Sequence, residues 1–335
     1  MLRKCLGIIL LAGCSGFLQA QVITNKDLLE MASRNYRAVE NENYAKALKL
    51  AKDKGWSLTI KSSNGRNAVL VGVDAVGHPK YYITQNNTIA AATTKANQLW
   101  PGGSTGLNLT GSSAGLKNKL GIWDEGKILT THVELTGRVT QKDNASSLAD
   151  HATHVAGTMI ASGINPIAKG MAYGIQGMVA YDFDNDFSEM FSEASNLILS
   201  NHSYGIIAGW NYNSSFSRWE FWGRAGENED YKFGYYSEDA QLLDSIAFNA
   251  PNYLIVKAAG NNRAYTGPDE GTKYYRYNAT NQMVDAGNRP AGISSNDAYG
   301  SIAWDANAKN ILTVGAVEGI PGGYNRKEDV IMSSF

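Results

Sequence analysis

Three short motifs in this sequence contain side chains that could do chemistry together. Asp124 begins an Asp-Glu-Gly tripeptide, and His151 begins the octapeptide His-Ala-Thr-His-Val-Ala-Gly-Thr. Asn261 ends an Ala-Gly-Asn tripeptide. A carboxylate can orient an imidazole, and a side-chain amide can donate a hydrogen bond to a developing oxyanion. These residue types therefore indicate a site that handles a proton and stabilises a negatively charged oxygen.

The elements that carry these motifs alternate along the chain from residue 120 onward. Apolar runs indicate strands at residues 120–123, 177–181, 197–202, 253–258 and 311–317. Helical spacing is found at residues 153–161, 187–195 and 237–249, and Asp186 is expected to cap the second of these helices. Alternating strands and helices predict a parallel sheet with helices on both faces, and functional groups gather beyond the strand ends in such sheets.

The residues upstream of 118 show a different pattern, with one helix followed by short strands and a linker. Tyr44, Ala47 and Ala51 have helical spacing before Gly55, which predicts a helix that ends there. Residues 56–60 and 68–73 then read as a hairpin, and residues 81–84 could form a third strand. A stretch rich in Gly, Ser, Thr and Asn follows Pro101 and is expected to be a linker. The sequence thus predicts a small α+β unit and linker over residues 21–117, followed by a second domain at 118–335.

Length, composition and net charge indicate a protein of about two domains and argue against one class of partner. The chain has 335 residues, which corresponds to roughly two domains, and 18% of them are charged, below the usual share of about 25%. The formal net charge is −1, so no strong positive field is present to attract phosphate backbones, which argues against a nucleic-acid partner.

The first 20 residues have the layout of a secretory signal peptide. Arg3 and Lys4 precede a mostly apolar stretch that ends at Leu18, and Ala20 offers a small residue for cleavage. This stretch is too short to span a bilayer comfortably, so export without a transmembrane segment is predicted. An alternative is that Leu-Ala-Gly before Cys14 acts as a lipobox, which would anchor the protein through a lipid. Both cysteines of the chain fall in this segment, so cleavage would leave no thiol for a disulfide or a metal site.

In order and spacing, the three motifs resemble those of subtilisin-like serine peptidases of the subtilase family. The family has Asp-Ser/Thr-Gly where this chain has Glu125, and His-Gly-Thr-His where it has Ala152. The resemblance covers about residues 119–335. It implies a three-layer α/β fold with a parallel sheet, and a secreted serine endopeptidase that hydrolyses polypeptides. In that reading Asp124 orients His151, His151 is the general base, and Asn261 helps to bind the oxyanion.

The resemblance also implies how substrate and N-terminal region are used. The segment around Ser203-Tyr204-Gly205 is similar to the family's edge segment, whose backbone pairs with an extended peptide substrate. Residues 21–117 resemble, by position and layout, the family's prosegment, a folding aid and inhibitor of its own peptidase. The residues expected to bind substrate are Ser203, Tyr204, Gly205, Ala258, Ala259 and Gly260.

The nucleophile of this chemistry has no match in the sequence. The family supplies it from a Gly-Thr-Ser motif, and no serine after Asn261 lies in such a motif. The last residues, from Ile331 to Phe335, resemble a family segment that precedes the catalytic serine. The expectation is a subtilase truncated before its serine and inactive as written. The alternative is a catalytically dead peptide-binding or inhibitory protein.

Other patterns are weaker. Ser113, in Gly-Ser-Ser-Ala-Gly, has the form of a nucleophile elbow but lies in the predicted linker. No metal site is predicted: His151 and His154 lack the other ligands of a zinc site, and structural calcium is possible by family without identifiable ligands. The acidic residues at 182–193 imitate a calcium loop, except that Phe187 stands where Gly is needed. The aromatic-rich residues 210–236 could rim a peptide cleft or pack onto their own core.

Overall fold

The computed structural model describes residues 24–61, 67–84, 91–293, 300–320 and 322–333. The predicted signal peptide and the lipobox alternative at Cys14 lie outside these residues. None of the helices within the described ranges combines the length and the apolar character needed to cross a membrane.

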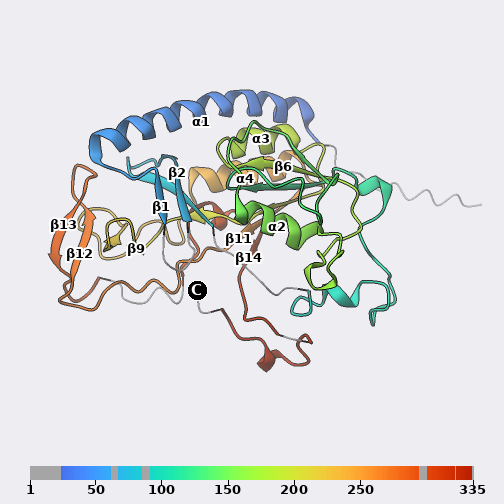
Figure 1. Ribbon diagram of the computed structural model, residues 1–335. Helices are drawn as coiled ribbons and strands as arrows, with labels where there is room; N and C mark the ends of the chain where they lie inside the picture. The colour runs from blue at the N-terminus through green and yellow to red at the C-terminus, as the bar shows by residue number, and fades with distance from the viewer. Residues whose placement is uncertain (1–23, 62–66, 85–90, 294–299, 321, 334–335) are drawn as a thin grey trace, which may run out of the picture.

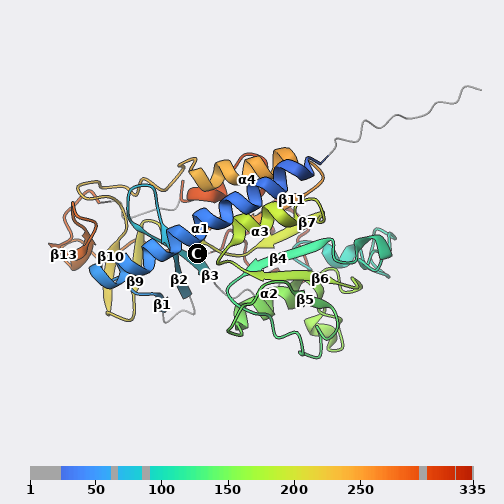
Figure 2. The same ribbon diagram turned by 90° about the horizontal axis from the view of Figure 1, so that it is seen from above.

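A six-stranded parallel sheet forms the centre of the molecule, in the order β14-β11-β7-β4-β6-β5. Its strands are β4 (Leu120–Asp124), β5 (Val139–Gln141), β6 (Met178–Asp182), β7 (Leu199–His202), β11 (Leu254–Ala258) and β14 (Leu312–Val314). Three helices adjoin it: α2 (Asp150–Ile160), α3 (Asp186–Glu193) and α4 (Glu238–Asn249). The helix α2 lies on one face, and α3 and α4 lie on the other (Figures 1 and 2). The predicted α/β fold, a parallel sheet with helices on both faces, is confirmed.

Apolar side chains on one stripe of α2 hold it against the sheet. Ala152, Ala156 and Ile160 are completely buried and pack with Ile122 of β4 and Ala180 of β6. Small residues at two of these positions let the helix approach the strands closely. This contact carries the start of α2 to the carboxyl end of β4.

The same face of the sheet is uncovered beyond β4. Leu199, Leu254, Leu312 and Val314 are 37–48% exposed, although they lie in strands of the central sheet. Their register places Leu199 beside Leu254 across β7 and β11. The helix α2 therefore covers only the β4–β6 half of this face, and the β7–β11–β14 half presents apolar side chains to solvent.

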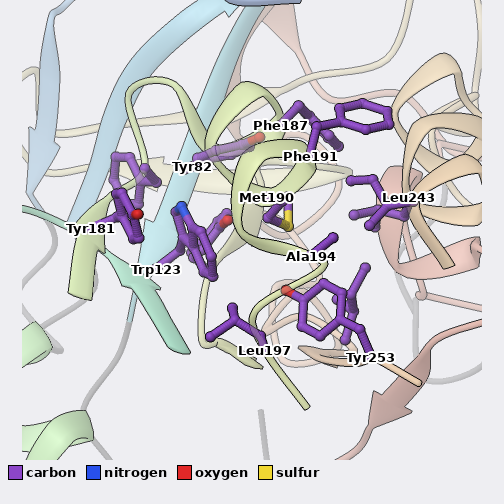
Figure 3. Close-up of a cluster of buried hydrophobic side chains, with 14 of the residues drawn as sticks. Tyr82, Trp123, Tyr181, Phe187, Met190, Phe191, Ala194, Leu197, Leu243 and Tyr253 are labelled. Atoms are coloured by element: carbon purple, nitrogen blue, oxygen red, sulfur yellow. The ribbon is translucent and has the colours of Figure 1, made fainter. Parts of the chain in front are cut away.

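The opposite face is closed by a large aromatic core (Figure 3). Trp123 of β4 stacks on Tyr181 at a centroid distance of 4.8 Å and on His202 at 5.2 Å. Phe187 and Phe191 of α3 extend the same cluster toward α4. Burying large aromatic rings on this side supplies much of the hydrophobic stabilisation of the fold.

Residues 24–84 form an N-terminal unit whose helix and sheet lie against the rest of the chain. Its elements are α1 (Lys26–Lys54), β1 (Thr59–Lys61), β2 (Asn67–Val73) and β3 (Pro79–Thr84). The helix begins earlier than the predicted one because Asn25 caps it by accepting from the Leu28 amide, and Gly55 ends it in the left-handed conformation, as expected. The three strands pair antiparallel, and β3 also pairs with β8 (Gly205–Ile206) of the downstream chain. In the residues that follow, 101–117, only a short 3₁₀ turn at Ala114–Leu116 occurs.

A third sheet, of four strands, was not predicted. We call it the outer sheet; it has the order β13-β12-β10-β9. Its strands are β9 (Trp210–Asn213), β10 (Arg218–Phe221), β12 (Lys273–Tyr277) and β13 (Met283–Asn288). Trp210 and Phe221 are buried within it, and Trp219 packs beside Tyr212 and Tyr265. The aromatic stretch at 210–236 therefore packs only partly on its own core: Trp222 packs with residues of the N-terminal unit, and Tyr231 and Phe233 pack against the main core. The remaining short 3₁₀ helices are Ala96–Gln98, Pro166–Ala168, Trp304–Asn307 and Lys327–Asp329.

The start of α3 differs from the prediction that Asp186 caps it. The N-cap residue is Asn185, and Asp186 turns its carboxylate into the core, where the hydroxyls of Tyr82 and Tyr204 donate to it at 2.8 and 2.9 Å. The cap is supplied instead by Glu40 of α1, which accepts from the Phe187 amide at 3.0 Å. The capping prediction was wrong because the carboxylate that takes this role lies 147 positions earlier in the sequence, and the local sequence around α3 cannot reveal so distant a partner.

One buried carboxylate fixes the chain where α2 ends. Glu134 is 5% exposed and accepts hydrogen bonds from the Ser162 hydroxyl and from the amides of residues 163–165, at 2.7 to 3.1 Å. These bonds, with the Asn165 amide contributing most, lower the pKa of Glu134 to about 2. The loop after α2 is thus built around a negative charge.

We predict that Glu134→Gln lowers the free energy of unfolding by about 2 kcal/mol at neutral pH, because several charge-assisted hydrogen bonds weaken together. The pKa of Glu134 is depressed in the folded state, so its contribution is present above pH 4.5, the ordinary pKa of glutamate, and is lost as the pH falls toward 2. Urea titrations at several pH values should show the difference between wild type and variant shrinking over that interval. The exposed Glu328→Gln is the matched control, and an equal effect of both variants would contradict the prediction.

Candidate active site

Four parallel strands bring the motif residues to one edge of the central sheet. The strands β4, β7, β11 and β14 run in the same direction, so their carboxyl ends meet there. Asp124 is the last residue of β4, and Asn261 lies three residues beyond β11. His151 is the second residue of α2 and faces the same edge. Residues separated by 137 positions in the sequence thus share one site.

Asp124 and His151 are in direct contact. The Nδ1 atom of His151 lies 2.5 Å from Oδ1 of Asp124, and the two side chains are 4% and 1% exposed. A bond to Nδ1 fixes the orientation of the ring and the tautomer that it adopts. In an arrangement of this kind the other ring nitrogen, Nε2, is the one that exchanges a proton with a reactant.

The surroundings of Asp124 set its charge. Its Oδ1 also accepts from the Glu125 amide at 2.8 Å, whereas Oδ2 has no hydrogen-bond partner among the described residues. Burial raises the pKa of Asp124 above its ordinary value, while the hydrogen bond from His151 opposes that rise. The carboxylate therefore depends on the imidazole for much of its stabilisation, and a protonated imidazole would bind it more strongly still.

The turn after β4 positions the helix that carries His151. Gly126 has φ +65°, and a Cβ at this residue would lie 2.7 Å from the carbonyl oxygen of Ser147. That close approach lets Lys127 donate to Ser147 at 2.7 Å and accept from Ala149 at 2.9 Å. The loop after Asp124 is thereby tied to the residues just before α2.

Glu125 and Ala152, which depart from the family pattern, both fit the local structure. Among the described residues, neither Glu125 nor Ala152 has a positive φ, so neither position requires glycine. The methyl group of Ala152 is completely buried among the apolar residues between α2 and the sheet. The alanine therefore fits the helix–sheet contact.

A cavity of about 270 Å³ opens beside this pair. His151 and Asn261 both line it, together with four of the six residues that the sequence suggested for substrate binding. Those four are Ser203, Ala258, Ala259 and Gly260. Gly260 has φ +112°, a conformation that brings Asn261 out of the strand direction and to the rim of the cavity.

The other two suggested residues do not line the cavity. Tyr204 is 1% exposed, and its hydroxyl donates to Asp186 in the core. Gly205 is the first residue of β8, where its backbone pairs with Ile83 of β3. Tyr204 is thus a core residue, and the strand edge at Gly205 is already paired with the N-terminal unit.

Lys257 is a positioning residue that the sequence analysis missed. It is 2% exposed, pairs with Asp305 at 2.9 Å, and donates to the carbonyl oxygen of Tyr204 at 3.1 Å. This bond fixes the turn between β7 and β8, next to Ser203. A lysine inside an otherwise apolar strand is the signal that could have indicated it, because a buried cation requires partners.

His154 lies one turn beyond His151 and lines the same cavity. Its pKa is lowered, first by burial and then by the neighbouring His151. Within the described ranges, no group of three or more His, Cys, Asp or Glu side chains is arranged to hold a metal ion.

A comparison with family models supports the resemblance. A family model described as the subtilase family, Peptidase_S8, matches residues 104–331. A search of curated proteins finds no match. Similar solved structures include the prenylagaramide maturation protease PagA, 18% identical over 64% of this chain and 67% of that one, with a TM-score of 0.31. The CspB protease of Clostridium perfringens is 17% identical, over 53% of this chain and 41% of its own, also at TM-score 0.31.

We predict that Asp124→Asn changes the tautomer of His151. An asparagine side chain can present its NH₂ group to Nδ1, which favours the ring with its proton on Nε2. Nitrogen-15 NMR of the imidazole should show Nδ1 losing its proton in a large part of the population, without unfolding.

Asp150→Asn is the matched control, because Asp150 lies in the same helical turn, whereas the carboxylate that contacts Nδ1 of the ring is that of Asp124. Identical ring tautomers in the wild type and both variants would contradict the orienting role of Asp124.

Proposed function

The chain belongs to the subtilase family, and on this premise we propose that it acts as an exported serine endopeptidase on polypeptide substrates. The observation that carries the proposal is the 2.5 Å contact between the buried pair Asp124 and His151 at the carboxyl edge of the parallel sheet. A buried carboxylate bonded to Nδ1 of a histidine beside an open cavity is the arrangement that a serine nucleophile needs.

In the proposed mechanism, Nε2 of His151 takes the proton from a serine hydroxyl as its oxygen attacks the peptide carbonyl carbon. Asp124 holds the proton on Nδ1 and stabilises the imidazolium that forms. Asn261 donates from its side-chain amide to the oxygen that becomes negative. His151 then gives its proton to the leaving amine, and water releases the acyl group by the same steps in reverse.

The serine itself is proposed to come from residues outside the printed sequence, which contains no Gly-Thr-Ser motif. The uncovered half of the sheet supports this proposal. Leu254, Leu312 and Val314 present an apolar surface next to the cavity that His151 lines. An amphipathic helix packed there would bury that surface, and a serine at its start would face the cavity.

We further propose that residues 1–20 direct export, residues 21–117 act as a prosegment, and residues 118–335 form the peptidase domain. The pairing of β3 with Gly205 and Ile206 supports an inhibitory prosegment, because it occupies an edge that an extended peptide could otherwise join. In this state the N-terminal unit and a substrate strand compete for the same backbone groups.

The proposal predicts a difference between two forms of the protein. The 335-residue chain should show no labelling by a fluorophosphonate probe of serine nucleophiles. A longer product, translated through a downstream Gly-Thr-Ser motif, should be labelled and should digest unfolded casein. In that longer product, His151→Ala should lower kcat/KM by roughly 10⁴-fold or more.

The control is Glu125→Ser, which restores the residue type common in the family and should leave activity within a few-fold. Labelling of the 335-residue chain would show that its nucleophile lies within these residues. A folded longer product that binds casein without cleaving it would favour a peptide-binding protein instead.

A further inference from the structure

A lysine is buried directly behind one wall of the cavity that His151 lines. Lys257 is 2% exposed and lies in β11 between Val256 and Ala258, both of which line the cavity. Successive side chains of a strand point to opposite faces of the sheet. The side chain of Lys257 accordingly lies on the other face, where its ammonium group meets the ring of Tyr204 in the aromatic core.

The ammonium group of Lys257 contacts two further segments of the chain at once. It pairs with Oδ2 of Asp305 at 2.9 Å and donates to the carbonyl oxygen of Tyr204 at 3.1 Å. It also lies 3.9 Å from the ring centroid of Tyr204, where the π electrons attract a cation. An ammonium group has three protons to donate, so one side chain can serve both segments.

Tyr204 is held at both of its ends. Lys257 binds its carbonyl oxygen, and its hydroxyl donates at 2.9 Å to Asp186, which is 4% exposed. Ser203 and Gly205 flank Tyr204 in the chain. These contacts therefore restrict the backbone of the segment that the sequence suggested for substrate binding.

Asp305 extends the contact to a third wall of the cavity. It lies in the short 3₁₀ helix before β14, and the carbonyl oxygen of the next residue, Ala306, accepts from the Thr313 hydroxyl at 2.8 Å. Thr313 belongs to β14, which pairs with β11, and Val314 at the end of β14 lines the cavity. The turn after β7, the end of β11 and the end of β14 thus share one buried cation, that of Lys257.

Stability alone does not explain the pair of Lys257 and Asp305. Oδ1 of Asp305, a residue that is 2% exposed, has no hydrogen-bond partner among the described residues, so this carboxylate depends on Lys257. Taking two charges out of water costs free energy, and apolar side chains of similar volume often stabilise a core equally well. A methionine would fill the space of Lys257 but could not donate to the Tyr204 carbonyl. What the lysine adds is the direction of its hydrogen bonds.

We propose that Lys257 is the positioning residue of the substrate cavity: it holds the turn after β7, the end of β11 and the end of β14 at the spacing that an extended polypeptide backbone requires. This inference rests on the proposed function, because it assigns the cavity to a peptide. Lys257 acts through Tyr204 and Asp305 and not through the pair Asp124 and His151. Its loss should therefore weaken peptide binding and leave the chemical step nearly unchanged.

The first test uses the 335-residue chain and needs no activity. The double variant Lys257→Met/Asp305→Asn removes both charges, so that neither stays buried without its partner. Hydrogen–deuterium exchange followed by mass spectrometry should show residues 203–207 and 311–316 exchanging roughly 10-fold faster than in the wild type, because these walls open more often. Unchanged exchange in both segments would overturn the proposal. If the double variant does not fold, Lys257→Gln, whose shorter side chain cannot reach Tyr204 and Asp305 together, takes its place with the same expected and opposing outcomes.

Lys232→Met/Asp230→Asn is the matched control. This pair is also buried, with its charged atoms 2.9 Å apart, and Lys232 also donates to a carbonyl oxygen, that of Trp222. Neither Lys232 nor Asp230 is among the residues that line the cavity. The control should leave the exchange of residues 203–207 and 311–316 as in the wild type. Equal acceleration by both double variants would indicate a general loss of stability and would overturn the proposal.

The second test separates binding from chemistry. In the longer product that carries a Gly-Thr-Ser motif, Lys257→Met/Asp305→Asn should raise KM for an extended octapeptide roughly 10-fold and change kcat by less than about three-fold. An unchanged KM, or a loss confined to kcat, in a product that cleaves the peptide would overturn the positioning role. A longer wild-type product that cleaves nothing would contradict the proposed function instead, and the exchange experiment would still decide whether Lys257 holds the walls.

Discussion

The carboxylate of Asp124 is 1% exposed, so the hydrogen bonds that it loses to water must be replaced by partners within the protein. The position of α2 provides one of these partners. The imidazole of His151 supplies one partner to Asp124, and the Glu125 amide supplies another. For the imidazole to arrive there, α2 must begin directly above the end of β4. The close backbone contact at Gly126 and the small residues on the inner stripe of α2 make that approach possible. The helix, the turn and the sheet edge therefore act together to give one buried carboxylate its partners.

The sequence predicts the parts of this architecture that depend on local patterns. Apolar runs and helical spacing located five of the six strands of the central sheet and its helices, and the motifs placed Asp124 and His151 at one edge. The short strand β5 was missed, because its three residues carry no buried apolar run. The outer sheet escaped prediction because its strands pair residues far apart, such as Glu220 with Tyr275. The sequence also could not tell that Ser203 lines the cavity and that Tyr204 does not, because this too depends on contacts between distant residues. Only the packing decides that one side chain faces the cavity while the next reaches Asp186 in the core.

The N-terminal unit is integrated more deeply than its separate sequence character suggests. Leu29 and Tyr82 are members of the same buried core as Trp123 and Phe191. Figure 3 shows Tyr82 beside Trp123 in this core. Its strand β3 extends across to β8, so a single sheet contains segments of both parts of the chain. Hydrophobic burial, a helix cap and buried polar pairs all cross the boundary between them. By these contacts the two parts make one folded structure.

Glu40 of α1 caps α3, and the ribosome synthesises α1 long before it synthesises α3. When α3 leaves the ribosome, about 147 residues have been added since Glu40 emerged, and α1 has long been available as a partner. The contacts within α1 and between β2 and β3 are local in sequence, whereas those between α1 and α3 are not, and local contacts form faster. The order of translation therefore lets the N-terminal unit serve as a preformed surface on which the later helices settle.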